Sequence, residues 1–135
     1  MAKLKNILYE IKLIAISGSR ELEITGIAFD SRKVKPGDLF VAIKGLTTDG
    51  HAHLDQAVSL GAVALLVEQV PLNPPQHVAI IQTDDCAKSL GIIAGNFYNH
   101  PSRKLKLIGI TGTNGKTTTV TLLHALFTQL GYQVG

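Results

Sequence analysis

The chain has 135 residues, of which 45% are hydrophobic and 17% charged, and its net charge at pH 7 is +3. This balance indicates a folded globular protein and excludes an intrinsically disordered one. The lysines and arginines are scattered without aromatic residues between them, so nucleic-acid binding through a basic stripe is weakly supported. The single cysteine, Cys86, excludes a disulfide framework, and we expect it to be a buried or half-buried helix residue.

The N-terminal segment predicts a short amphipathic helix, because Leu4, Ile7, Leu8 and Ile11 recur at helical spacing. Charged residues at positions 10 and 12 interrupt the apolar run, whereas a secretory signal needs about 7–15 uninterrupted apolar residues. No stretch approaches the ~20 apolar residues of a membrane-spanning helix. We therefore expect a cytoplasmic protein that does not bind membranes.

Strands and helices then alternate along the chain. Apolar runs predict strands at residues 22–29, 39–43, 62–67 and 77–81. A short helix is expected from Ala52, with Gly61 as the left-handed residue that ends it. A longer helix should have Thr83 or Asp84 as its N-cap and end before Pro101. The residues expected on its buried face are Ala87, Leu90, Gly91, Ala94 and Phe97. This order indicates an α/β fold, with a small mixed or parallel sheet flanked by helices.

A glycine-rich loop at residues 112–117 is the most informative motif of the chain. It reads Gly-Thr-Asn-Gly-Lys-Thr, and the common phosphate-loop pattern would need a glycine at position 110, where this chain has Ile110. The context supports a phosphate loop all the same, because residues 105–111 predict a buried strand before it. The apolar residues that predict a helix after it are Val120, Leu122, Leu123, Leu126, Phe127 and Leu130.

Such a loop binds the phosphates of a nucleotide triphosphate. Glycines let successive N–H groups point at anionic oxygens, and the helix that follows directs its positive end to the same place. Lys116 would place a cation on the β- and γ-phosphates, and the Thr117 hydroxyl would ligate Mg²⁺. The residues expected to bind ATP are Gly112, Thr113, Asn114, Gly115, Lys116, Thr117 and Thr118.

A domain boundary is expected near Pro101–Lys104. Residues 1–103 hold enough strands and helices for a small α/β domain. Residues 104–135 hold a strand, the loop, a helix and the apparent start of a second strand at 133–135, and such a unit cannot bury both of its faces. We therefore expect residues 104–135 to be the incomplete start of an ATP-binding domain in a truncated chain.

The sequence offers two interpretations for each of two polar groups, the histidines near Asp49 and Arg32. His51 and His53 lie close to Asp49 in the sequence. Side chains two positions apart on a helix point to different faces, so a helix-start turn is favoured over a metal site. Arg32 could pair with Asp38 or reach a substrate phosphate, and the sequence leaves both possibilities open.

Two motifs together point to one family. The segment Phe29-Asp-Ser-Arg-Lys-Val-Lys-Pro-Gly-Asp-Leu-Phe-Val-Ala-Ile-Lys-Gly45, with Asp49-Gly-His51 and Gly61-Ala-Val-Ala-Leu-Leu-Val67, resembles the N-terminal domain of the Mur ligases. The loop Thr111-Gly-Thr-Asn-Gly-Lys-Thr-Thr-Thr119 looks like the ATP loop of the same enzymes, including its short glycine spacing. Within the family the chain looks most like the MurE type, and the MurF type stays open.

The resemblance implies an amide-forming ligase of peptidoglycan precursor synthesis. A MurE-type enzyme uses ATP and Mg²⁺ to phosphorylate the side-chain carboxylate of UDP-N-acetylmuramoyl-L-alanyl-D-glutamate. The amine of a diamino acid, meso-diaminopimelate or L-lysine, then displaces phosphate. Activation is needed because an amine attacks an acyl phosphate far faster than a carboxylate, and the enzyme aligns and neutralises the phosphate charge. The resemblance makes Lys116 the candidate catalytic residue, and a monomeric enzyme is expected.

The resemblance also implies that residues 1–103 hold the UDP end of the substrate. Carried over by motif, Phe29 and Ser31 would contact the nucleotide, and Leu46, Thr47 and Thr48 would form the loop beside it. Ser and Thr hydroxyls suit a pyrophosphate or a uracil edge. The competing interpretation of Ser31 is a turn residue at the end of a strand.

Two other functions remain as alternatives. One is a free-standing UDP-sugar-binding module with a vestigial phosphate loop, and the other is a different phosphate-loop enzyme such as a kinase. The Asp30-Ser-Arg segment argues against a kinase. By itself, the chain is expected to be inactive as a ligase.

Overall fold

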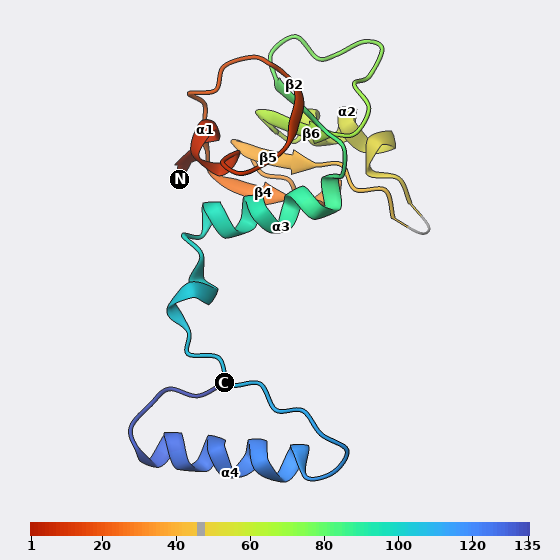
Figure 1. The fold of residues 1–135 in the computed structure, drawn as a ribbon. Helices are drawn as coiled ribbons and strands as arrows, with labels where there is room; N and C mark the ends of the chain where they lie inside the picture. The colour runs from red at the N-terminus through yellow and green to blue at the C-terminus, as the bar shows by residue number, and fades with distance from the viewer. Residues whose placement is uncertain (46–47) are drawn as a thin grey trace. The chain divides into compact units, whose positions relative to one another are not determined.

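The computed structural model describes residues 1–45 and 48–135. The chain divides into two compact units, Met1–Ser102 and Arg103–Gly135 (Figure 1). The first unit contains a β-sheet with helices on both faces, and the second contains a helix of 14 residues. The described residues include no helix with the length and apolar character needed to cross a bilayer.

A five-stranded mixed sheet with the order β2-β7-β6-β5-β4 forms the centre of the first unit. Its strands are β2 (Leu13–Ser17), β4 (Gly26–Ala28), β5 (Asp38–Val41), β6 (Ala64–Val67) and β7 (Ala79–Thr83). Strands β4, β5, β6 and β7 run parallel to one another, and β2 runs antiparallel to β7. The expected α/β fold with a small mixed sheet is therefore confirmed.

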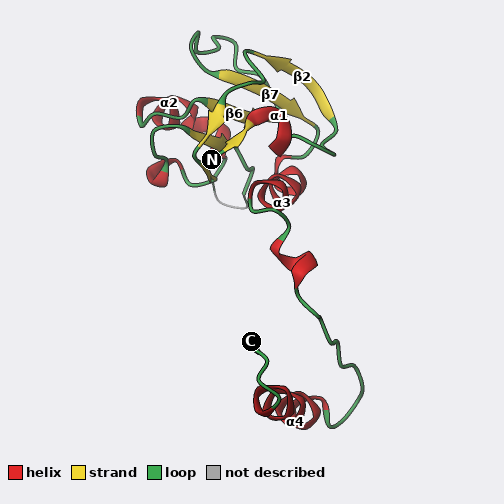
Figure 2. Ribbon diagram, turned by 90° about the vertical axis from the view of Figure 1, so that its left-hand side faces the viewer, coloured by secondary structure: helices red, strands yellow, loops and turns green. Residues whose placement is uncertain are grey.

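Helices cover both faces of this sheet (Figure 2). On one face lie α1 (Leu4–Ile7) and α3 (Cys86–Phe97), and on the other lies α2 (Leu54–Ser59). The described connections also include the short 3₁₀ helices η1 (Ser31–Lys33), η2 (Gly50–His53) and η3 (Pro101–Lys104).

The core follows the two-residue period of the strands. In β5, Leu39 and Val41 pack with α1 and α3, whereas Phe40 packs with α2. All four residues of β5 and all four of β6 are buried, because both faces of the sheet are covered. Each fully buried large apolar side chain contributes about 1.5–3 kcal/mol relative to leaving it exposed.

The turns around Gly37 and Gly61 pack against each other. Gly61 has a φ of +103° and its amide bonds the Val58 carbonyl, so the predicted left-handed end of α2 is confirmed. A Cβ on Gly61 would lie 2.8 Å from the Cα of Pro36, so the contact requires glycine. The Gly37 amide donates to the Gly61 carbonyl at 2.9 Å, which holds the start of β5 beside the end of α2.

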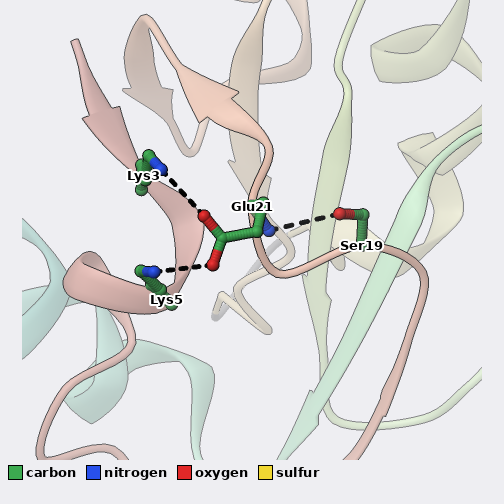
Figure 3. Close-up of polar contacts among 4 residues, drawn as sticks. All are labelled: Lys3, Lys5, Ser19 and Glu21. Carbon is green, nitrogen blue, oxygen red and sulfur yellow. Dashed lines mark hydrogen bonds and ion pairs between the residues drawn. The ribbon is translucent and has the colours of Figure 1, made fainter.

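The N-terminal ribbon is a second, smaller sheet in which β1 (Ala2–Lys3) pairs with β3 (Glu23–Ile24). Glu21 lies between two lysines and accepts a hydrogen bond from each, at 2.8 Å from Lys3 and 2.6 Å from Lys5 (Figure 3). Its own amide donates to the Ser19 hydroxyl at 3.2 Å. These contacts join β1 and α1 to the segment that leads into β3.

Near the N-terminus, the bounds of the predicted helix and strand differ from those of the structure, and one strand was not predicted. The helix ends at Ile7, and the strand β2 that follows was missed. Asn96 donates to the carbonyls of Ile7 and Tyr9, so the end of α1 is satisfied by α3 and the chain turns into the sheet. The strand predicted at 22–29 is divided at Thr25, where the chain leaves the ribbon and joins the main sheet as β4.

The longer helix is confirmed as α3, which ends before Pro101, but its N-cap was predicted wrongly and its buried face only partly correctly. Asp85 is the N-cap, and its side chain accepts a hydrogen bond from the Lys88 amide at 2.8 Å. Thr83 instead ends β7, where its hydroxyl lies 3.0 Å from that of Ser89. The buried residues of α3 are Cys86, Ser89 and Ile93. Of the predicted face, Leu90 and Phe97 pack against the core, whereas Ala87 and Gly91 are exposed. The buried position of Cys86 was predicted correctly.

The second unit is built around α4 (Lys116–Gln129), and the helix predicted after the phosphate loop is confirmed. Residues 103–135, all of which the structure describes, form no strand, so the strands predicted at 105–111 and 133–135 are wrong. A lone strand has no neighbour with which to exchange backbone hydrogen bonds, and most of this apolar segment is exposed. Gly131 ends α4 with a φ of +83°.

Candidate functional site

The carboxyl ends of the parallel strands form the first candidate site. In an open α/β sheet, ligands bind outside these strand ends. Residues 29–32 follow β4 and the loop 42–49 follows β5, and β4 and β5 are neighbours in the sheet. Phe29, Ser31 and Thr48 therefore belong to segments that leave the sheet at the same edge. Leu46 and Thr47, the other two expected substrate residues, lie outside the described residues.

Ser31 begins η1 and is buried, with only 7% of its surface exposed. Its hydroxyl donates to the Oε1 atom of Gln56 on α2 at 2.7 Å. The oxygen keeps its acceptor lone pairs, so a ligand N–H could still donate to it. Sequence reasoning missed Gln56, because it lies 25 positions away from Ser31 and no local pattern connects the two residues.

Asp30 and Arg32 form a tight pair beside Ser31. The Asp30 carboxylate accepts from the Arg32 amide at 3.1 Å and from Nε and Nη2 of its guanidinium at 2.9 Å each. The Arg32 side chain holds the pKa of the Asp30 carboxyl at about 2. Of the two possibilities left open for Arg32, pairing with Asp38 does not occur, because Asp38 accepts from the Lys35 amide and from the Thr25 hydroxyl.

The side chain of Phe29 is 63% exposed, an unusual position for a large aromatic residue. It immediately follows β4, and an exposed ring at this edge can stack on a planar ligand such as a nucleobase. The base of the loop after β5 consists of Lys44, Gly45, Thr48 and Asp49. The Gly45 amide donates to the Thr48 carbonyl at 2.9 Å, and a β-bridge joins Lys44 to Asp49.

The Asp49-Gly50-His51 segment is a helix-start turn, as predicted. The Asp49 carboxylate caps η2 by accepting from the His51 amide at 2.9 Å. The His51 ring contacts Asp49 through Nδ1 and the Glu68 amide through Nε2. Across residues 1–45 and 48–135, no three His, Cys, Asp or Glu side chains are grouped as metal ligands would be.

The phosphate loop of the second unit is the second candidate site. Gly115 has a φ of +79° and is the N-cap of α4, so a residue with little left-handed strain is needed there. The first amides of a helix have no acceptor within it, and they are available to an anion together with the positive end of the helix dipole. The Lys116 ammonium donates to the carbonyls of Gly112 and Thr113.

These residues fit a nucleotide phosphate by the chemistry of their donors. Lys116 supplies a cation, and Thr117 and Thr118 supply hydroxyls and amides at the start of α4. The loop residues Gly112 to Thr118 are exposed, and nothing lies within 4 Å of a Cβ built on Gly115. The Thr117 hydroxyl is of the oxygen type that Mg²⁺ prefers, and magnesium bound with a nucleotide takes further oxygens from the phosphates and water.

The sequence profile of the Mur ligase family, catalytic domain, matches residues 23–98. The chain belongs to the Mur ligase family. The matched segment includes Phe29, Ser31 and Thr48 of the sheet edge and ends before the phosphate loop of the second unit.

Among curated Mur ligases, the chain is 48% identical over 134 residues to the UDP-N-acetylmuramoyl-L-alanyl-D-glutamate--2,6-diaminopimelate ligase of Cytophaga hutchinsonii. It is 48% identical over 133 residues to the enzyme of the same name from Bacteroides fragilis. Both alignments cover 98% of this chain, but only 28% and 27% of the two relatives. The chain therefore spans about a quarter of the length of these relatives.

Solved Mur ligase structures resemble the chain as well. MurF from Acinetobacter baumannii has 33% sequence identity and a TM-score of 0.55, over 79% of this chain and 22% of that chain. The MurF ligase from Thermotoga maritima in complex with ADP has 30% identity and a TM-score of 0.55, over 81% of this chain and 24% of its own.

Proposed function

We propose that this chain is part of an ATP-dependent ligase that adds 2,6-diaminopimelate to UDP-N-acetylmuramoyl-L-alanyl-D-glutamate. The observation that carries the proposal is the 48% identity, over 98% of the chain, to a relative named for that reaction. The solved MurF structures are less similar, at 30–33% identity, which favours the MurE type over the MurF type. Because ATP and nucleotide-linked sugars are cytoplasmic metabolites, the reaction belongs in the cytoplasm.

In this proposal residues 1–103 bind the UDP end of the substrate. The exposed ring of Phe29 stacks on the nucleotide, and the Ser31 hydroxyl accepts a hydrogen bond while it donates to Gln56. Thr48, at the base of the loop after β5, is assigned to the same substrate, and so are Leu46 and Thr47, which lie outside the described residues. This arrangement follows the rule that ligands bind at the carboxyl ends of parallel strands.

Residues 104–135 then begin the ATP-binding domain. Bound ATP with Mg²⁺ supplies the phosphoryl group that activates the substrate carboxylate. Lys116 exchanges its contacts with the Gly112 and Thr113 carbonyls for phosphate oxygens and neutralises their charge. The amides and hydroxyls of Thr117 and Thr118 orient the phosphates, and the Thr117 hydroxyl ligates the metal ion.

A ligation assay with the complete gene product tests this proposal. The protein is incubated with ATP, Mg²⁺ and UDP-N-acetylmuramoyl-L-alanyl-D-glutamate, and with either diaminopimelate or L-lysine. Diaminopimelate should be incorporated with release of ADP and phosphate. Lys116→Ala should lower kcat by on the order of 10²–10³, as expected for the loss of a charge-stabilising donor. Lys104→Ala removes a lysine outside the loop and should leave kcat unchanged.

The other outcomes identify the alternatives. Addition of D-alanyl-D-alanine to the UDP-linked tripeptide would assign the MurF type instead. Incorporation of L-lysine in preference to diaminopimelate would overturn the choice of amino acid. Binding of the UDP-linked substrate without any ligation would favour the free-standing UDP-sugar-binding module.

A further inference from the structure

His51 joins two parts of the first unit that are far apart in sequence. Its Nδ1 atom lies 2.7 Å from the Oδ1 atom of Asp49, at the base of the loop after β5. Its Nε2 atom lies 2.9 Å from the backbone nitrogen of Glu68, immediately after β6. The His51 side chain is 18% exposed. The ring therefore bridges the ends of two neighbouring parallel strands at the sheet edge that carries Phe29 and Ser31.

The two contacts determine the tautomer of the ring. A backbone N–H can only donate, so Nε2 must be the acceptor and carry no proton. The single proton of the neutral ring is then on Nδ1, from which it is donated to the Asp49 carboxylate. A second proton on Nε2 would face the Glu68 N–H and break that contact.

Both ends of the bridge are held by the rest of the fold. On one side, Gly50 donates to the Ile43 carbonyl at 2.9 Å, and a Cβ on Gly50 would lie 2.8 Å from the Ile43 nitrogen. On the other side, the Glu68 carbonyl accepts from the Gln82 side chain at 3.0 Å. The Glu68 carboxylate accepts from the Cys86 amide at 3.1 Å. The loop base is thus fastened through His51 to β6, β7 and the start of α3.

We propose that His51 is a positioning residue, which holds the described base of the loop after β5 (Lys44, Gly45, Thr48 and Asp49) against the end of β6, at the sheet edge where the UDP-linked substrate is proposed to bind. The inference rests on the proposed function, because that proposal assigns the loop to the substrate. His51 acts through the loop and not on the reacting atoms. Its neutral, Nδ1-protonated ring is the form that makes both contacts.

The bridge should depend on pH, and the surrounding charges determine the direction. The charged or titratable groups around His51 include Asp49, with Lys44 beside it, His53 of the same 3₁₀ helix, and Glu68 at the end of β6. The amide of His51, and then its ring, hold the pKa of the Asp49 carboxyl below its usual range, so Asp49 stays ionised and attracts a protonated ring. The Glu68 N–H disfavours the protonated ring, because it needs an unprotonated Nε2 atom as its acceptor. Protonation of His51 therefore keeps the Asp49 contact and releases the loop base from β6.

Calorimetric titration of the complete gene product with UDP-N-acetylmuramoyl-L-alanyl-D-glutamate tests the inference. His51→Ala should raise the Kd of this substrate about tenfold, since it leaves the Glu68 amide without its acceptor and frees the loop base. The KM for ATP should not change. The matched control is His53→Ala, which removes an exposed imidazole from the same 3₁₀ helix and should bind like the wild type.

His51→Gln separates hydrogen bonding from packing. The glutamine amide offers one donor and one acceptor at a spacing similar to that of the two ring nitrogens, and it does not titrate. This variant should restore the wild-type Kd to within about twofold at high pH. Lowering the pH should weaken wild-type binding, because a proton on Nε2 of His51 would face the Glu68 N–H, whereas binding by His51→Gln should stay level.

Hydrogen exchange supplies a readout that does not need the substrate. In His51→Ala, the amides of Gly45 and Glu68 should exchange faster than in the wild type and in His53→Ala. If His51→Ala bound the substrate and exchanged its amides like the wild type, the inference would be overturned. It would also be overturned if His51→Ala and His51→Gln lost the same amount of substrate affinity. If the wild type binds no UDP-linked substrate, the proposed function fails, while the exchange rates still decide whether His51 fastens the loop.

Discussion

The hydroxyl of Ser31 has a structural partner, which changes how its expected binding role must be tested. It donates to Gln56 while lying at the carboxyl end of β4, so removing it affects the fold as well as a ligand. Gln56 is exposed, and water can replace the serine hydroxyl as its partner. The structural cost of the substitution should therefore be modest.

Ser31→Ala should lower the free energy of unfolding by about 0.5–1.5 kcal/mol, the usual net value of a hydrogen bond. It should also weaken binding of the UDP-linked substrate about tenfold, if the hydroxyl accepts from the nucleotide. Gln56→Ala is the matched control, because it removes the same internal bond and keeps the hydroxyl. Urea unfolding and calorimetry measure the two effects. Equal losses of binding in both variants would mean that Ser31 acts only through the fold.

Single side-chain partners were the least predictable feature of the site. The position of Ser31 after a strand and the helix-start turn at Asp49 could be predicted, because both depend on residues close in sequence. The partner of Arg32 could not be predicted, because Asp30 and Asp38 are both close in sequence. Only the folded backbone determines that Arg32 pairs with Asp30. The contact of His51 with Glu68 spans 17 positions and has no local signal.

At the scale of elements, a strand was predictable where its neighbours are present in the chain. The apolar runs at 39–43, 62–67 and 77–81 supply most of β5, β6 and β7, because helices cover both faces of the sheet. The run at 105–111 also carries four large apolar residues, yet it forms no strand in a unit that offers it no pairing partner. Strand β2 was missed because its apolar residues follow directly on a helical pattern, and only its pairing with β7 identifies it.

The N-terminal ribbon offers an electrostatic prediction at this scale. Hydrogen bonds from Lys3 and then Lys5 lower the pKa of the Glu21 carboxyl to about 2 from its ordinary 4.5. A carboxyl whose pKa is depressed by folding stabilises the folded state above its unfolded pKa. That contribution should be lost as the pH falls from about 4.5 towards 2. The ribbon should therefore loosen in acid before the main sheet.

A carbon-13 NMR titration of the Glu21 carboxyl measures this pKa directly. Lys3→Gln should raise it, because Lys3 makes the largest contribution to the shift. Lys12→Gln is the control, since Lys12 pairs with Asp84 and not with Glu21. A Glu21 carboxyl that titrates at its ordinary value in the wild type would contradict the ion-pair geometry of Figure 3.

At the scale of the whole molecule, the two units differ in how much of their apolar surface is buried. The first unit contains both core clusters, and the Mur ligase profile matches within it. In the second unit, α4 has no buried residue, and Leu122, Leu126 and Leu130 are 66%, 49% and 61% exposed. Most helical stability in proteins comes from packing of an apolar face, so these two units should differ in local stability.

Hydrogen exchange on the 135-residue chain compares two helices of similar length, the 12 residues of α3 and the 14 of α4. In α3, Cys86, Ser89 and Ile93 are buried and Asp85 caps the N-terminus, so its central amides should be protected. In α4, the threonines at positions 117, 118, 119 and 121 have low helix propensity. The contact of Phe127 with the Tyr132 ring offsets little of this, because no residue of α4 is buried. The amides of α4 should exchange on the order of a hundredfold faster than the central amides of α3, or faster still.

The complete gene product provides the matched comparison. If residues 104–135 begin an ATP-binding domain, the rest of that domain should cover the apolar side chains of α4, and its amides should become as protected as those of α3. Protection of α4 already in the 135-residue chain would show that the helix is stable without such a cover. Fast exchange of α4 in the complete product would instead contradict the assignment of this segment to a packed domain, and with it the proposed role of Lys116.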